Sequence, residues 1–184
     1  MKQDEENIVR IKNKHESIGN IVHNHSKIEH GLSMWLASLI SDDDVIGFII
    51  TSEMSIRSLI KAFLSIIKYK AKTEKLISDN LESIINLVTR INNVEQDRNI
   101  YAHSLILHYE LDYNDEDYEK DDENYVKLKM TAKEKGFKLN MTDIKLEDLK
   151  KVIKEQDKVI KEIANYSLIT VGRKNYDMKK LKEI

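Results

Sequence analysis

The spacing of hydrophobic residues along the chain predicts four long helices. Apolar side chains recur every three or four positions in four separate segments, as one face of an amphipathic helix requires. These segments run from about Asp4 to Ile40, from Asp42 to about Ile67, from about Thr73 to the region of Arg98, and from about Leu146 to Leu168.

The second of these helices has the widest apolar face and is expected to be the most buried of the four. Three consecutive aspartates, Asp42 to Asp44, can end the first helix and cap the second one. Gly31 is a position where the first helix is expected to kink or divide. The apolar face of the second helix consists of Val45, Ile46, Phe48, Ile49, Ile50, Ile56, Ile60, Phe63, Leu64 and Ile67.

Between about residues 105 and 141 the hydrophobic period changes from about four to two, which is typical of strands. Alternating runs begin at Leu105, Val126 and Phe137, and a turn from Lys133 to Gly136 can join the last two. The predicted fold class is therefore mainly α: a four-helix up-and-down bundle with a small antiparallel β insertion before the last helix.

Length and composition indicate one globular domain. The chain has 184 residues with neither proline nor cysteine, which favours long helices and excludes disulfides and thiolate metal sites. No apolar run reaches the ~18 residues of a membrane span, and the N-terminus is too acidic for a secretory signal. We expect a cytoplasmic protein with no membrane association, comprising a helical domain at 1–171 and a basic, flexible tail at 172–184.

Charge is distributed unevenly. The formal net charge is −2, yet the segment from Asp112 to Glu123 alone carries −7, so the rest of the chain carries +5. A near-neutral total argues against a protein that coats nucleic acid without selectivity. An acidic segment on a mildly basic body is compatible with a local RNA site, and we expect the segment to be a solvated tip of the β insertion.

The apolar stripe of the third helix leads directly to a charged residue. Ile77, Leu81, Ile84, Val88 and Ile91 step by four, three, four and three. Continued in the same rhythm, the stripe next reaches Glu95, Arg98 and Ala102, unless Asn92 and Asn93 interrupt the helix and reset its phase. An Arg in line with a core face needs an anion, a partner or a cleft, because an unpaired buried charge is costly.

The stretch Arg98-Asn99-Ile100-Tyr101-Ala102-His103 contains the most informative chemistry of the chain. Spacing alone does not distinguish it, since Arg10 and His15 are equally far apart. The residues between the Arg and the His distinguish the two stretches, because only the second reads Arg-Asn-x-x-Ala-His. This pattern resembles the HEPN superfamily, whose signature is an Arg, usually a polar residue, and a His four to six positions after the Arg. The order of the predicted elements also fits.

The resemblance implies a function. HEPN proteins are often RNA-cleaving toxins or defence nucleases that act as dimers, and others are binding modules without catalysis. In an RNA-cleaving member, His103 would abstract the proton of a ribose 2′-hydroxyl and Arg98 would stabilise charge on the attacked phosphate. The expected products are a 2′,3′-cyclic phosphate and a 5′-hydroxyl, formed with no metal and no cofactor. Asn99 would orient the phosphate or His103, and Tyr101 is a candidate for stacking on a base.

Helix geometry constrains this site. Asn99 and His103 share a face, whereas Arg98 and His103 lie roughly 140° apart on an ideal helix. Either the helix ends near the motif, or two copies complete each other's site across a dimer axis. The second option agrees with the homodimer that the resemblance implies, and an antitoxin or regulatory protein is a further candidate partner.

Two alternatives remain open on the sequence. The chain could be a non-catalytic HEPN-like module that binds a nucleotide, an RNA or a protein. It could also be a structural dimerisation protein in which Arg98 pairs with Glu95 and His103 caps a helix end. The histidines of the first helix do not predict a metal site, because His23 and His25 point about 160° apart; the others there are His15 and His30.

Overall fold

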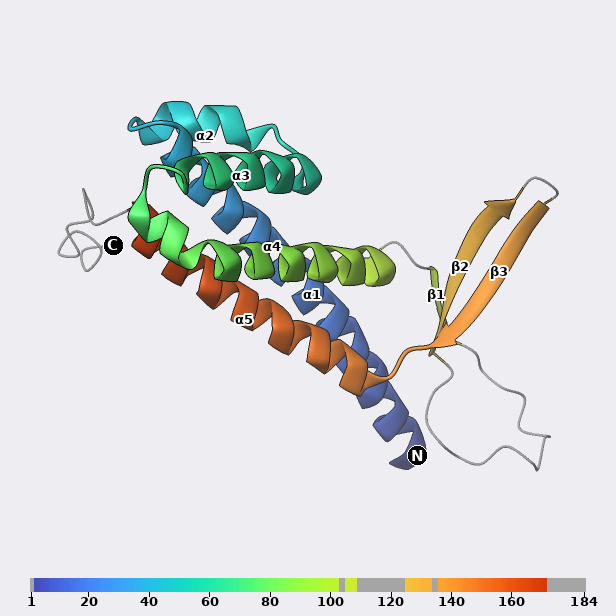
Figure 1. Ribbon diagram of the computed structural model, residues 1–184. Coiled ribbons are helices and arrows are strands. Elements are labelled where there is room, and N and C mark those ends of the chain that lie inside the picture. The colour runs from blue at the N-terminus through green and yellow to red at the C-terminus, as the bar shows by residue number, and fades with distance from the viewer. Residues whose placement is uncertain (1, 103–104, 109–124, 134–135, 172–184) are drawn as a thin grey trace. The chain divides into compact units, whose positions relative to one another are not determined.

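The computed structural model describes residues 2–102, 105–108, 125–133 and 136–171. These residues are mainly helical, as the sequence predicts, and contain five helices and three strands (Figure 1). The helices are α1 (Lys2–Ile40), α2 (Asp44–Ser52), α3 (Ile56–Lys70), α4 (Lys75–Ala102) and α5 (Leu146–Val171). The strands are β1 (Leu105–His108), β2 (Tyr125–Lys133) and β3 (Gly136–Asp143).

The second predicted helix is in fact two, and this corrects the expected count of four. The Asp43 carboxylate caps α2, accepting hydrogen bonds from the backbone N–H groups of Val45 and Ile46 at 2.9 and 3.3 Å. The Ser55 hydroxyl caps α3 by accepting a bond from the N–H of Ser58 at 3.3 Å. A second N-cap only twelve residues after the first divides the segment, since each cap residue takes a non-helical backbone conformation.

The chain groups into two compact units, which we describe separately. The first unit contains Met1–His23 and Val94–Glu155, and the second contains Asn24–Asn93 and Gln156–Ile184. Each unit therefore includes parts of α1, α4 and α5, together with either the strands or the helices α2 and α3. None of the helices in the described ranges is both long enough and apolar enough to cross a membrane.

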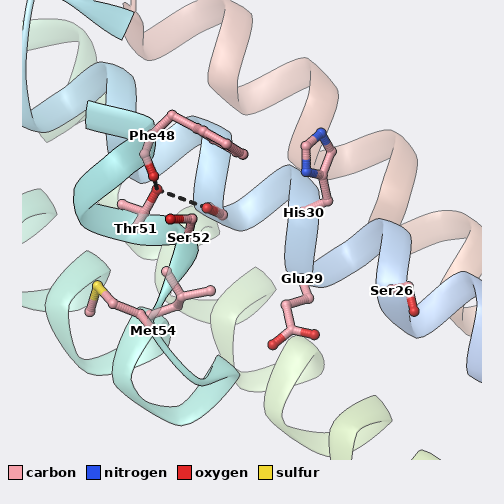
Figure 2. A pocket seen from close by; sticks show the side chains of 9 residues that line it. Ser26, Glu29, His30, Phe48, Thr51, Ser52 and Met54 are labelled. Carbon is pink, nitrogen blue, oxygen red and sulfur yellow. Dashed lines mark hydrogen bonds between the residues drawn. The ribbon is translucent and has the colours of Figure 1, made fainter. Parts of the chain in front are cut away.

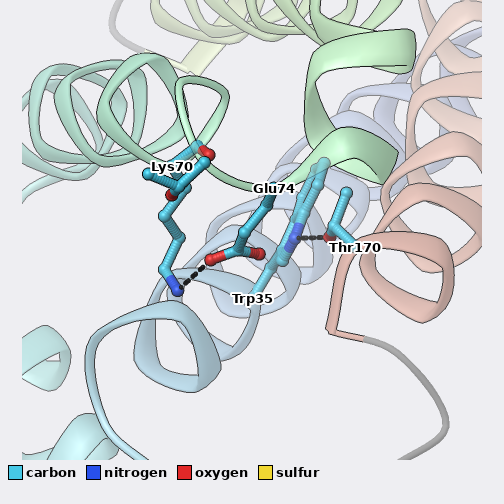
Figure 3. Close-up of polar contacts among 5 residues, drawn as sticks. Trp35, Lys70, Glu74 and Thr170 are labelled. Carbon is cyan, nitrogen blue, oxygen red and sulfur yellow. Dashed lines mark hydrogen bonds and ion pairs between the residues drawn. The ribbon is translucent and has the colours of Figure 1, made fainter.

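The core of the second unit is built around Trp35. Its indole packs edge-on against Phe63, with ring centroids 4.4 Å apart, and its Nε1–H donates a hydrogen bond to Thr170 Oγ1 at 2.7 Å (Figure 3). Gly31 does not divide α1, which is continuous from Lys2 to Ile40. Gly31 instead permits close packing against α5, since a Cβ there would lie 3.2 Å from Cγ2 of Ile163. These contacts join α1, α3 and α5.

Two partly exposed ion pairs add polar contacts to the second unit. Arg90 on α4 donates to both carboxylate oxygens of Glu162 on α5, at 2.8 and 2.7 Å. Lys70 pairs with Glu74 at 2.8 Å across the turn between α3 and α4 (Figure 3). The Arg90–Glu162 pair links two helices that are distant in sequence, whereas the lysine pair is local.

The first unit combines a small hydrophobic cluster with the sheet. Ile21, Ile144 and Leu149 form the buried centre of the cluster, and Tyr101 is among the half-buried residues that pack against it. The sheet has the order β1-β2-β3 with both pairs antiparallel, and Leu128 lies opposite Leu105 on one side and Met141 on the other. The sheet precedes α5, and residues 109–124 between β1 and β2 lie outside the described ranges.

Candidate functional site

The buried stripe of α4 continues into the motif. The helix is uninterrupted across Asn92 and Asn93, so its phase is preserved. Ile91 is fully buried and Glu95 retains only 6% of its exposure, which confirms that the stripe reaches a carboxylate. Arg98, the next position in the rhythm, is half-buried. A carboxylate and a guanidinium thus occupy successive positions that an ordinary core stripe would fill with apolar side chains.

Asn99 joins these two charged groups. Its Nδ2 donates a hydrogen bond to Glu95 Oε1 at 2.7 Å, and its Oδ1 accepts one from Arg98 Nη1 at 2.8 Å. Because an amide has one donor end and one acceptor end, the carboxylate fixes which end faces the guanidinium. Both bonds involve a charged partner and are therefore stronger than bonds between neutral groups.

This network has a direct structural consequence. A hydrogen bond from Arg98 Nη1 to Asn99 Oδ1 tethers the guanidinium in the last turn of α4. The sequence named Asn99 as a supporting residue and Glu95 only as a direct partner of Arg98. The relay through the amide was missed, although the separation of four residues between Glu95 and Asn99 already permits such a contact on a helix.

Tyr101 is half-buried against the cluster of Ile21, Ile144 and Leu149, whereas the adjacent Ala102 is exposed. Burial raises the pKa of its phenol above the usual 10.0, and the negative charges of Asp148 and Asp97 raise it further. The hydroxyl therefore stays protonated at neutral pH. Its packing against the cluster leaves the stacking role predicted for Tyr101 without further support.

The other half of the predicted catalytic pair, His103, lies outside the described residues, so the geometry between Arg98 and His103 stays a prediction. The acidic segment from Asp112 to Glu123 and the basic tail at 172–184 also lie outside them. The structure thus brings together Arg98, Asn99 and Glu95, and places Tyr101 against the adjoining hydrophobic cluster.

A groove in the second unit was not predicted from the sequence. It has a volume of about 230 Å³, and Figure 2 shows it between α1 and α2. Ser33 donates a hydrogen bond to Thr51 Oγ1 at 2.8 Å, and the His30 ring meets Phe48 edge-on at 6.3 Å. The lining residues are Ser26, Glu29, His30, Ser33, Phe48, Thr51, Ser52, Met54 and Leu59.

We assign this groove a packing role. Its volume is smaller than the ~300 Å³ at which ligand pockets usually begin. Its hydroxyl groups bond to one another and to the backbone, since Thr51 Oγ1 also lies 3.2 Å from the carbonyl oxygen of Gly47. A sequence signal existed on α1, where the polar residues that line the groove, Ser26, Glu29, His30 and Ser33, share one helix face at spacings of three and four.

The histidines of α1 are dispersed. His25 is buried, whereas His15, His23 and His30 are exposed. Among the residues that the structure describes, no group of three or more His, Cys, Asp or Glu side chains is placed to hold a metal ion.

Comparisons with models of known protein families, with curated proteins and with solved structures found no match to this chain.

Proposed function

We propose that the chain is a metal-independent endoribonuclease of HEPN type, acting as a homodimer in the cytoplasm as a toxin or phage-defence effector. In this proposal the helices form an up-and-down bundle, and β1 to β3 are an insertion before α5. Arg98 and His103 carry the reaction and Asn99 supports it. The substrate is RNA, since the attacking group is a ribose 2′-hydroxyl.

The observation that carries the proposal is the network that holds Arg98. A guanidinium fixed by Asn99, itself oriented by the buried Glu95, is prepared to meet a phosphate without further reorganisation. An exposed surface Arg has no comparable support. The negative end of the α4 dipole disfavours an anion at this helix terminus, so a cation is required there for phosphate binding.

Chain connectivity supports the pairing with His103. Arg98 and Ala102 lie in the same α-helix, about 6 Å apart along its axis. One further peptide unit spans about 3.8 Å between Cα atoms. Covalent connectivity therefore limits the separation of the Arg98 and His103 Cα atoms to about 10 Å, which permits both side chains to approach one phosphate within a copy.

In the proposed reaction His103 takes the proton of the 2′-hydroxyl, and the resulting oxygen attacks the adjacent phosphorus. The bond to the 5′-oxygen of the next nucleotide breaks, and that oxygen gains a proton. Arg98 stabilises the additional negative charge on the phosphate oxygens with its planar fork of donors. A 2′,3′-cyclic phosphate and a 5′-hydroxyl result.

The test is cleavage of a mixed-sequence RNA in EDTA by the wild type and by Arg98→Ala. The variant is expected to lose roughly 10²–10³ in rate, because an electrostatic donor to the transition state is removed. Arg98→Lys is expected to recover only part of the loss, since an ammonium lacks the planar fork. Arg10→Ala is the matched control, because Arg10 has the same spacing to a histidine.

Several outcomes would decide against this mechanism. Equal cleavage by the wild type and Arg98→Ala, with circular dichroism showing both folded, would remove Arg98 from the reaction. Products with 5′-phosphate ends would exclude attack by the 2′-hydroxyl. RNA binding by the wild type without cleavage would favour the non-catalytic HEPN-like module instead.

A further inference from the structure

Helix α2 buries its small residues and exposes its large ones. A Cβ at Gly47 would lie 2.6 Å from the carbonyl oxygen of Ala37 on α1, so the backbone of α2 lies directly against that helix. Thr51, one turn later, is buried and accepts a hydrogen bond from Ser33. Gly47 and Thr51 thus define the inward side of α2.

The outward side of α2 is apolar. At 100° per residue, Ile49 is on the side opposite Gly47 and Thr51, and it is 63% exposed. Its neighbour Val45, one turn earlier, is 66% exposed. We use the term α2 face for the five exposed large apolar side chains of this helix: Val45, Ile46, Phe48, Ile49 and Ile50.

This arrangement corrects the expectation for the first part of the second predicted helix, which was expected to be the most buried of the four. The α2 part exposes its large apolar residues, whereas the α3 part buries Ile56, Leu59, Phe63 and Ile67. The prediction was wrong because it assumed that large apolar residues face the interior. The side of α2 that faces α1 is instead determined by the close approach of the two helix backbones, which requires a residue without a large side chain at Gly47. A contiguous apolar surface of this kind is costly to leave in water and usually marks an interaction site.

We propose that the α2 face is an isologous interface with a second copy of this chain. The exposed fractions of its five residues correspond to an apolar area on the order of 500 Å² per copy, so that two copies would bury on the order of 1,000 Å², the size at which specific interfaces begin. A two-fold axis brings a surface onto itself, and an uncharged apolar face is complementary to itself.

Charge favours this occupant over a lipid surface. The chain has no charged residue from Val45 to Ser52, but Asp42, Asp43 and Asp44 precede this stretch and Glu53 follows it. An acidic border repels the dense negative charge of an anionic lipid surface. In a dimer the same border lies at the solvated rim of the interface, where repulsion between the few like charges of the two copies is screened by water and salt. The homodimer is part of the proposed function, and the interface rests on that function only in taking a second copy as the partner.

Association is tested by size-exclusion chromatography with light scattering on the full chain, without RNA. The wild type is expected to be a dimer at micromolar concentration. Ile49→Lys is expected to weaken association by about 10²-fold, because it buries an unpaired charge at the centre of the interface. Leu76→Lys is the matched control, since Leu76 is a similarly exposed apolar residue of α4 at 58%.

Cross-linking provides a second readout that does not depend on breaking the interface. The chain contains no cysteine, so Ile49→Cys introduces a single thiol. Near a two-fold axis two such thiols form a disulfide on mild oxidation. Ile49→Cys is expected to yield a covalent dimer and Leu76→Cys a monomer.

A monomeric wild type, or a dimer that Ile49→Lys leaves intact, would overturn the interface. A dimer that fails to cut RNA would retain the interface and contradict the nuclease. A monomer that cuts RNA would overturn the interface and the proposed dimer but leave the cleavage chemistry intact. Binding of the α2 face to another protein by a monomeric wild type would likewise decide against a second copy.

Discussion

Glu95 and Arg98 carry opposite charges one turn apart on α4, and the amide of Asn99 connects them. Glu95 is almost fully buried, so its charge depends on hydrogen bonds to avoid a large desolvation cost. The bond from Asn99 Nδ2 is one of them. Asn99 therefore bonds to both charged groups: it stabilises the buried Glu95 carboxylate and orients the Arg98 guanidinium.

Asn99→Asp is expected to destabilise the fold by about 1–3 kcal/mol, because it places a second carboxylate beside that of Glu95 and replaces a donor with an acceptor. Asn99→Ala is expected to cost less, since it removes both bonds without adding charge. Urea unfolding followed by circular dichroism measures the difference near neutral pH. Equal stability of both variants at neutral pH would contradict the network.

Tyr101 predicts a stability change at alkaline pH. Its folded-state pKa is raised above 10.0 by burial and by Asp148 and Asp97. A raised pKa means that the neutral phenol stabilises the folded state below pH 10, and that this contribution is lost as pH rises through the folded-state pKa. As the pH rises above about 10, the wild type should lose more stability than Tyr101→Phe, measured by urea unfolding. Parallel losses would show that Tyr101 titrates as in the unfolded chain.

At the scale of helices, the two glycines Gly47 and Gly19 make opposite predictions. Gly47→Ala places a Cβ against the Ala37 backbone, which cannot give way as a flexible side chain can, so we expect a loss of about 1–3 kcal/mol. Gly19→Ala meets nothing within 4 Å, and we expect a gain of up to about 1 kcal/mol from helix propensity. Fluorescence of Trp35, the single tryptophan, reports unfolding of each variant. A neutral Gly47→Ala would contradict the close contact between α1 and α2.

The hydrophobic pattern predicted helices well where they bury a long regular stripe. The starts of α4 and α5 follow from spacing alone. Spacing left open whether Asn92 and Asn93 interrupt the third predicted helix, and α4 is continuous there. The pattern failed at α2, because periodicity records where apolar residues fall and not whether another element covers them. The break before α3 was also readable, since Ser55 has the side chain of an N-cap.

At the scale of the whole molecule, the sequence predicted the residues of the candidate site but not how they are connected. Arg98 was identified from the stretch Arg-Asn-x-x-Ala-His and from its place in line with an apolar stripe, whereas Glu95 was named only as the partner of Arg98 in the structural alternative. The relay through Asn99 depends on side-chain rotamers, which spacing does not determine. The arrangement of Arg98 with His103, on which catalysis depends, stays a prediction.

We propose that His103 is the base of a metal-independent RNA cleavage. The most direct test is the initial rate of RNA cleavage in EDTA by the purified wild type, by His103→Ala and by His15→Ala, with folding and oligomeric state checked for each. His15 is exposed and shares the spacing to an arginine, so it is the matched control. We predict cleavage to cyclic-phosphate ends by the wild type and His15→Ala, and none by His103→Ala. Equal cleavage by all three proteins would contradict the claim.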